Sequence, residues 1–167
     1  GRNILRALHE RKLQDTIEVV AINDLGSPEI NAHLLKFDTT HGRFDFDVRQ
    51  VDDGFEISGQ TIQVLGIRNP SDLPWDDLDV DVVYECTGLF ISNDQALAHI
   101  QAGAKKVIIS APGKDVDATI VYGVNDDSLT SDMQVISNAS CTTNCLVPLA
   151  KALDDAFGIE DGQITTI

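Results

Sequence analysis

Short apolar runs bounded by turn residues alternate with longer amphipathic stretches along most of the chain. The apolar runs are typical of buried strands, and the amphipathic stretches are typical of helices. This alternation predicts an α/β domain built on a parallel sheet. We expect strands at residues 17–22, 81–85, 106–110, 120–122 and 134–137, and helices at residues 3–11, 28–37, 92–102 and 141–157.

Between Arg43 and Leu65 the pattern changes to strict alternation of apolar and polar positions. The alternating runs are 46–48, 55–57 and 61–64, and Asp52-Asp53-Gly54 and Ser58-Gly59 separate them. Glycine beside Asp or Ser is typical of the tight turns that join antiparallel strands. We therefore predict a short antiparallel insertion in the parallel sheet.

Composition narrows the class of protein. The formal net charge is −15, which would repel nucleic-acid phosphates and argues against a nucleic-acid partner. No apolar run approaches the roughly 18 residues of a membrane span, so no membrane partner is expected. No charged-then-apolar stretch stands at the front of the sequence, so we expect no secretory signal, and the 3 cysteines are an odd number. This cysteine count fits a reducing, cytoplasmic location better than a disulfide framework.

Asp24 is the first candidate binding residue, because it lies two residues after the apolar run 17–22, at the carboxyl end of the expected strand. An acid at the carboxyl end of the second strand of a dinucleotide-binding unit accepts hydrogen bonds from the adenosine ribose. Its charge also repels a 2′-phosphate, which favours NAD over NADP. A turn or helix-cap role remains open. Gly1 is placed like the last glycine of a Gly-x-Gly-x-x-Gly loop, so we expect the first strand and the earlier glycines to precede this chain.

Cys141 is the candidate nucleophile, because a strand ends and a helix begins within the run Ser137–Cys145. Free N–H groups at a helix start favour a thiolate, and the same groups could hold the oxyanion formed when it attacks an aldehyde. A buried structural cysteine is the alternative, and for Cys145, one turn further on, we favour a structural role. No His or further Cys lies nearby, so no metal site is expected.

The run Ser137–Cys145 resembles the active-site signature of glyceraldehyde-3-phosphate dehydrogenases and of the similar erythrose-4-phosphate dehydrogenases. Further runs stand in the order of that family, at residues 21–24, 37–44, 85–88, 102–107 and 123–125. The resemblance implies a Rossmann-type doubly wound sheet whose first strand and glycine loop lie outside this chain. It also implies an NAD-binding domain over residues 1–140 and the start of a catalytic domain over residues 141–167.

The resemblance assigns roles to residues that match the family's motifs. It implies that Cys141 forms a hemithioacetal with a phosphorylated aldehyde, that NAD takes the hydride, and that phosphate or water cleaves the thioester. Ser140 and Thr142 are then expected to bind substrate. The expected cofactor contacts are Asp24, Arg68, Thr87, Gly88 and Ser110. The family's catalytic histidine is expected directly after Ile167, so this chain alone should be inactive. The complete protein is expected to be a homotetramer.

Two questions stay open at the level of the sequence. The segments 73–75 and 117–125 look more like the erythrose-4-phosphate enzymes, whereas 23–25 and 110–114 are equally typical of the glyceraldehyde-3-phosphate enzymes. The second question is whether the chain is a stand-alone NAD-binding module without catalysis. Cys141 at a helix start counts against that alternative, because a pure binding module has no need of it.

Overall fold

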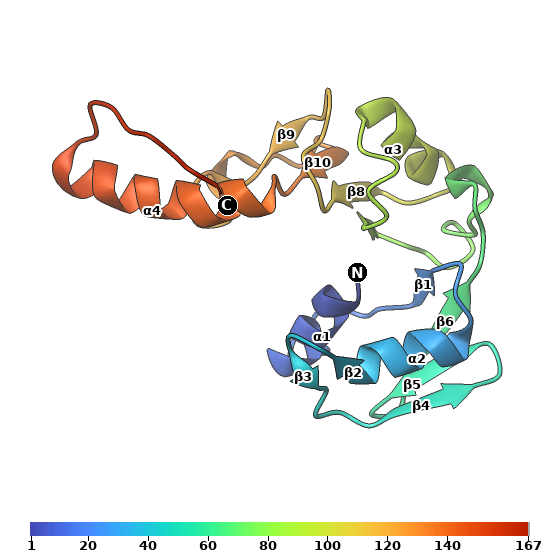
Figure 1. Cartoon of the computed structure of the whole chain (residues 1–167). Coiled ribbons are helices and arrows are strands. Elements are labelled where there is room, and N and C mark those ends of the chain that lie inside the picture. Colours follow the sequence, from blue (N-terminus) through green and yellow to red (C-terminus); the bar gives the residue numbers. More distant parts are fainter. Residues whose placement is uncertain (167) are drawn as a thin grey trace. The chain divides into compact units, whose positions relative to one another are not determined.

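The computed structural model describes residues 1–166, and these form two compact units. Unit 1 is Gly1–Leu73, and unit 2 begins at Pro74. Figure 1 shows the helices and strands of each unit. The sequence did not indicate a division after Leu73, and the expected domain boundary after residue 140 stays a prediction.

Unit 1 is built on a mixed sheet, sheet A. Strand β1 runs parallel to its neighbour β6, and the strands then continue antiparallel in the order β1-β6-β5-β4. The elements are α1 (Arg2–Glu10), β1 (Ala21–Asn23), α2 (Pro28–Lys36), β2 (Phe37–Asp38), β3 (Gly42–Arg43), β4 (Val48–Val51), β5 (Gly54–Ile57), β6 (Gln60–Leu65) and the 3-10 helix η1 (Pro70–Asp72).

The antiparallel insertion of sheet A is confirmed, and its turns explain its register. Ser58 and Gly59 both adopt positive φ, 51° and 91°, as the tightest hairpin turns require. A Cβ on Gly54 would lie 2.0 Å from the carbonyl oxygen of Ile62, so only glycine fits there. One face of the hairpins, carrying Phe55 and Ile62, packs in the core of unit 1.

Unit 2 is built on an all-parallel sheet, sheet C, in the order β7-β8-β10-β9. Its elements are β7 (Val82–Glu85), α3 (Asn93–Gln101), β8 (Lys106–Ile109), β9 (Ala118–Thr119), the 3-10 helix η2 (Asp126–Ser128), β10 (Val135–Ser137) and α4 (Cys141–Phe157). The expected α/β fold with a parallel sheet is therefore confirmed.

Some predicted strand boundaries were wrong. The run 17–22 forms a strand only over β1, because Ala21–Asn23 alone pairs with β6. The run 120–122 is not a strand. Its place is taken by β9, two residues earlier, because the Asn125 side chain bonds the backbone of Val121 and Thr119 and closes a turn there. The run expected at 46–48 is β4, which starts only at Val48.

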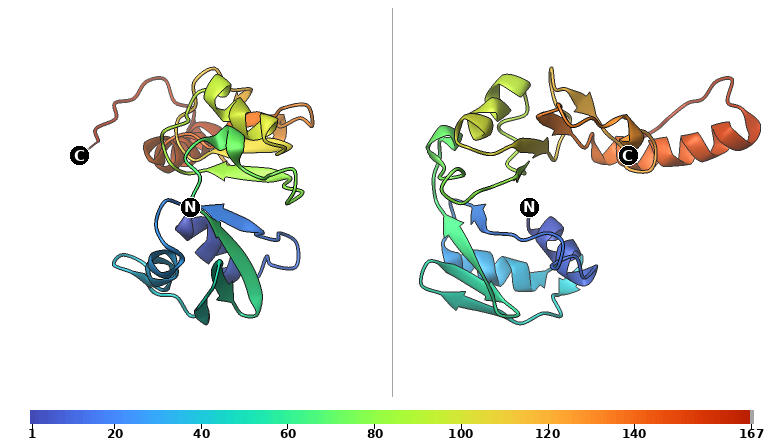
Figure 2. Two further views of the ribbon diagram at one scale, coloured as in Figure 1. Left: turned by 90° about the vertical axis from the view of Figure 1, so that its right-hand side faces the viewer. Right: turned by 180° about the vertical axis from the view of Figure 1, so that it is seen from behind.

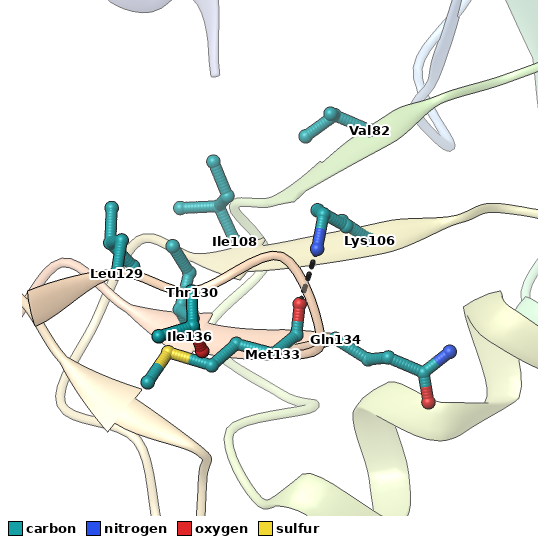
Figure 3. Close-up of a pocket in the computed structure, with 8 residues that line it drawn as sticks. All are labelled: Val82, Lys106, Ile108, Leu129, Thr130, Met133, Gln134 and Ile136. Carbon is teal, nitrogen blue, oxygen red and sulfur yellow. Dashed lines mark hydrogen bonds between the residues drawn. The ribbon is translucent and has the colours of Figure 1, made fainter.

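Sheet C has two different faces. Helix α3 packs against β8 and β10, and the residues buried on that face include Val107 and Val135. On the alternate positions Val82 and Tyr84 are exposed. A shallow pocket on this second face is lined by residues of sheet C and of the loop before β10, as Figure 3 shows: Val82, Lys106, Ile108, Leu129, Thr130, Met133, Gln134 and Ile136.

Helix α4 has the bounds that the sequence predicted, Cys141–Phe157. Figure 2 shows it as a single long helix after β10. None of its residues is buried, and Leu149, Leu153 and Phe157 form an exposed apolar stripe at helical spacing. Within residues 1–166, none of the helices combines the length and the apolar character needed to cross a membrane.

Candidate functional site

The carboxyl ends of β1 and β6 lie side by side in unit 1, because the two strands are parallel. Asn23, at the end of β1, donates from its amide to the carbonyl of Ile67 (2.8 Å) and accepts from the Ile67 N–H (2.9 Å). The Asp24 N–H donates to the Leu65 carbonyl at 2.9 Å. These bonds hold the segment after β6 beside the end of β1, so Asp24 and the segment carrying Arg68 occupy one edge of sheet A.

The Asp24 carboxylate is exposed and only partly engaged. Its Oδ1 accepts from the Gly26 N–H (2.7 Å) and from the Asn31 amide (3.4 Å), while Oδ2 makes no hydrogen bond within residues 1–166. A Cβ on Gly26 would lie 3.0 Å from Asp24 Oδ1 and 2.7 Å from Ile30, so glycine keeps this turn tight. Arg68 is also exposed.

The remaining candidate residues all belong to unit 2 and follow the carboxyl ends of its parallel strands. Thr87 and Gly88 follow β7, Ser110 follows β8, and Cys141 follows β10. The Ser110 N–H donates to the Glu85 carbonyl (2.9 Å), and the Asn138 N–H donates to the Ile109 carbonyl (3.1 Å). In open α/β sheets this edge is where ligands bind.

Ser137 joins two of these loops, a role that the sequence did not reveal. Its side chain is fully buried, and its hydroxyl donates to the Ala111 carbonyl at 2.6 Å. The same oxygen accepts from the N–H groups of Gly113 and Ala139, both at 3.0 Å. A hydroxyl has one donor and two acceptor positions, so all of its capacity is used. The loop after β8 is thereby fixed to the loop that leads to Cys141.

Cys141 is exposed and is the first residue of α4. Ser140 caps the helix, because its hydroxyl oxygen accepts from the Thr143 N–H at 2.9 Å. The N–H groups of Cys141 and Thr142 make no hydrogen bond within the described part of the chain. The buried Ala139 has φ of 63°, a conformation that costs a non-glycine residue energy and that gathers at functional sites.

The other cysteines are less distinctive. Cys145 is exposed, so the structural role favoured for it finds no support in burial. Cys86 is half-buried.

A buried polar chain leads to Thr87, and sequence patterns did not indicate it. The Trp75 indole N–H donates to His99 Nδ1 (3.1 Å), and His99 Nε2 lies 3.1 Å from Glu85 Oε2. Glu85 Oε1 accepts from the Thr87 N–H (2.6 Å) and from the Thr87 hydroxyl (2.5 Å). Burial raises the pKa of Glu85, but the hydrogen bonds from His99 and Thr87 outweigh burial and hold that pKa below its ordinary value.

Within unit 1 the structure thus brings together the Asp24 and Arg68 segments. Within unit 2 it brings the loops carrying Thr87, Gly88, Ser110, Ser140, Cys141 and Thr142 to one sheet edge. An α/β fold with polar loops gathered at the carboxyl ends of parallel strands is the architecture of nucleotide-binding domains.

Comparisons with known proteins define the family. Residues 1–93 match the family described as glyceraldehyde 3-phosphate dehydrogenase, NAD binding domain, and residues 140–167 match the C-terminal domain of the same family. The chain is 54% identical over 167 residues to a glyceraldehyde-3-phosphate dehydrogenase of Pseudomonas aeruginosa. It is 58% identical over 168 residues to the chromosomal glyceraldehyde-3-phosphate dehydrogenase of Cupriavidus necator. Each match covers 100% of this chain and 50% of the relative.

The chain belongs to the glyceraldehyde 3-phosphate dehydrogenase family and spans about half the length of the curated relatives it matches. Membership confirms the expected Rossmann-type fold and NAD as the cofactor of the matched domain. It also confirms the expected enzyme class, NAD-dependent oxidoreductases, at the level of the family.

Proposed function

We propose that the protein containing this chain oxidises glyceraldehyde 3-phosphate with NAD, using Cys141 as the nucleophile. The observation that carries the proposal is the position of Cys141. It is exposed, it starts a helix of 17 residues, and it lies two residues after the strained Ala139 at the carboxyl edge of a parallel sheet. The names of the relatives favour glyceraldehyde 3-phosphate over erythrose 4-phosphate.

The proposed chemistry begins with attack of the Cys141 thiolate on the aldehyde carbon, which gives a hemithioacetal. The free N–H groups of Cys141 and Thr142 are the donors available to the oxyanion that forms. Bound NAD supplies the hydride acceptor. The resulting thioester on Cys141 is cleaved by phosphate, which releases the acyl phosphate and restores the thiolate. Ser140 and Thr142 flank the nucleophile and are proposed to contact the substrate.

The residues of unit 1 fit one end of NAD. Asp24 presents a free carboxylate oxygen at an exposed sheet edge, and an adenosine ribose offers two neighbouring hydroxyl donors to such an acceptor. We assign Arg68, Thr87, Gly88 and Ser110 to the other cofactor contacts. The proposal also keeps residues 1–140 as the cofactor domain and residues 141–167 as the start of the catalytic domain. It includes a homotetramer, which rests on the family resemblance alone, and a cytoplasmic location, which rests on the odd number of cysteines.

The test is a steady-state assay on the protein at the full length of its relatives. We expect NADH to form from glyceraldehyde 3-phosphate, NAD and phosphate. Cys141→Ser should abolish this activity, and Cys145→Ser is the matched control that should keep it. If erythrose 4-phosphate were turned over faster, it would replace glyceraldehyde 3-phosphate as the proposed substrate. Tight NAD binding without any aldehyde oxidation would favour the stand-alone binding module.

A further inference from the structure

The direction of every hydrogen bond in the buried chain from Trp75 to Thr87 follows from the chemistry of its groups. An indole nitrogen can only donate, so Nδ1 of His99 must be the acceptor and carries no proton. The imidazole proton is therefore on Nε2, which donates to Glu85 Oε2. The ring is neutral, and its tautomer is fixed from one side by Trp75.

The carboxylate of Glu85 fixes Thr87, the last residue of this hydrogen-bonded series. Its Oε1 accepts two hydrogens from Thr87, one from the N–H and one from the hydroxyl. The hydroxyl oxygen of Thr87 also accepts from the Leu89 N–H at 3.1 Å. Its proton and one of its lone pairs are thus already used, and a single acceptor position remains.

The hydrogen-bonded series from Trp75 to Thr87 differs from an ordinary surface ion pair because it is buried. The side chain of Glu85 is 3% exposed and that of His99 is 5% exposed, and Trp75 as a whole residue is 5% exposed. At the other end of the hydrogen-bonded series, Thr87 and Gly88 are exposed. A buried carboxylate is costly, and well-packed apolar residues often serve stability as well or better. Stability alone therefore does not explain these buried polar groups. What they do at the exposed end of the series, where they fix the Thr87–Gly88 loop, explains them better.

We propose that Trp75, His99 and Glu85 are positioning residues that hold the Thr87–Gly88 loop and present the Thr87 hydroxyl to the cofactor as an acceptor only. The inference rests on the proposed function, because it takes this loop as a cofactor contact. The cofactor group that meets Thr87 must then be a hydrogen-bond donor, such as a sugar hydroxyl or an amide N–H.

Counting donors gives a test by double-mutant cycle. The variant Glu85→Gln replaces the carboxylate by an amide. If the amide oxygen still accepts from Thr87, the amide NH₂ group faces the Nε2–H of His99. If the ring moves its proton to Nδ1, that proton faces the Trp75 N–H. Either arrangement contains a pair of opposed donors. Trp75→Phe removes the indole donor, so in the double variant the ring can change tautomer and accept from the introduced amide.

The experiment measures NAD binding to the full-length protein by calorimetry. We expect Glu85→Gln to weaken NAD binding at least about 10-fold, Trp75→Phe alone to change it less than 3-fold, and the double variant to regain most of the loss. If the losses of NAD affinity in the two single variants simply added in the double variant, the proposed tautomer of His99 and its hydrogen bonds would be wrong. A Glu85→Gln variant that is less stable but binds NAD as tightly as the parent would overturn the positioning role.

A second measurement separates this inference from the proposed function. The ¹⁵N shifts of the imidazole of His99 in the unaltered protein report its tautomer whether or not NAD binds and whether or not the variants fold. A proton on Nε2 supports the chain, and a proton on Nδ1 or a doubly protonated ring overturns it. Failure of the unaltered protein to bind NAD would instead reject the proposed function and leave the tautomer result standing.

Discussion

Asn23 and Ser137 perform the same task at the carboxyl ends of strands in different units. Each is a small polar residue that bonds backbone groups of a segment distant in sequence, Ile67 in one case and Ala111 and Gly113 in the other. Sequence patterns predicted the candidate residues near them but not these links, because a polar residue at a strand end has many possible partners. The same holds for Glu85, His99 and Trp75, which lie on separate segments.

Replacement of Ser137 by Ala should destabilise unit 2. The N–H groups of Gly113 and Ala139 would lose their acceptor, and the Ala111 carbonyl would lose its donor. An unsatisfied buried group costs about 1–3 kcal/mol, and relaxation spares part of it, so we expect a loss of roughly 2–4 kcal/mol in the free energy of unfolding. Denaturant unfolding measures it, with Ser131→Ala at an exposed site as control. Equal stability of the two variants would contradict the role given to Ser137.

Replacement of Asp24 by Asn should weaken NAD binding and relax discrimination against NADP. Hydrogen bonds to a charged group contribute about 1.5–3 kcal/mol, which corresponds to roughly 10- to 100-fold in affinity. Removing the charge also removes the repulsion of a 2′-phosphate. Binding of both cofactors by the full-length protein is the measurement, and Asp53→Asn in a hairpin turn is the control. A preference for NADP with Asp24 intact would reject the assignment.

Among the elements, helices were predicted more accurately than strands. The bounds of α4 were predicted without error, because Ser140 caps its start and Gly158, with φ of 73°, ends it. Strand bounds depend on the ladder partner, which the sequence does not name. The run 17–22 is apolar throughout most of its length, yet only Ala21–Asn23 faces β6 in register. Ile120 and Val121 are buried in a turn closed by Asn125, so apolar character alone misplaced that strand.

Removing the serine caps of the two helices of unit 2, one at a time, should distinguish an effect on helix stability from an effect on the reactivity of Cys141. Ser92 caps α3 in a capping box with Gln95, and Ser140 caps α4. Each Ser→Ala change should cost about 1 kcal/mol of stability. Only Ser140→Ala should alter the rate at which iodoacetamide labels Cys141, because the cap orders the first turn that carries the thiol. Labelling followed by peptide mass spectrometry provides the rate. An equal change in both variants would mean that the rate reports global stability.

On the scale of the whole molecule, acidic charge dominates. The chain has 27 acidic and 12 basic side chains, so no arrangement of ion pairs can neutralise it. Some pairs do form: Lys105 bonds Asp81 at 2.6 Å and approaches Asp79 at 3.6 Å, and Lys151 bonds Asp155 at 2.9 Å. These pairs are exposed, and exposed pairs contribute about 0–1 kcal/mol each. We therefore expect repulsion among the excess carboxylates to outweigh the attraction within the pairs.

Salt should accordingly raise the Tm of this chain at neutral pH. Screening shortens the Debye length from about 30 Å at 0.01 M to about 10 Å at 0.1 M, which weakens long-range repulsion before it weakens contacts of about 3 Å. We expect Tm to rise between about 10 and 300 mM NaCl, with each kcal/mol of relieved repulsion worth about 2–4 °C. Choline chloride at equal ionic strength is the control, because screening does not depend on the identity of the cation. A fall in Tm over this range would mean that the ion pairs of Lys105 and Lys151, or others like them, outweigh the repulsion.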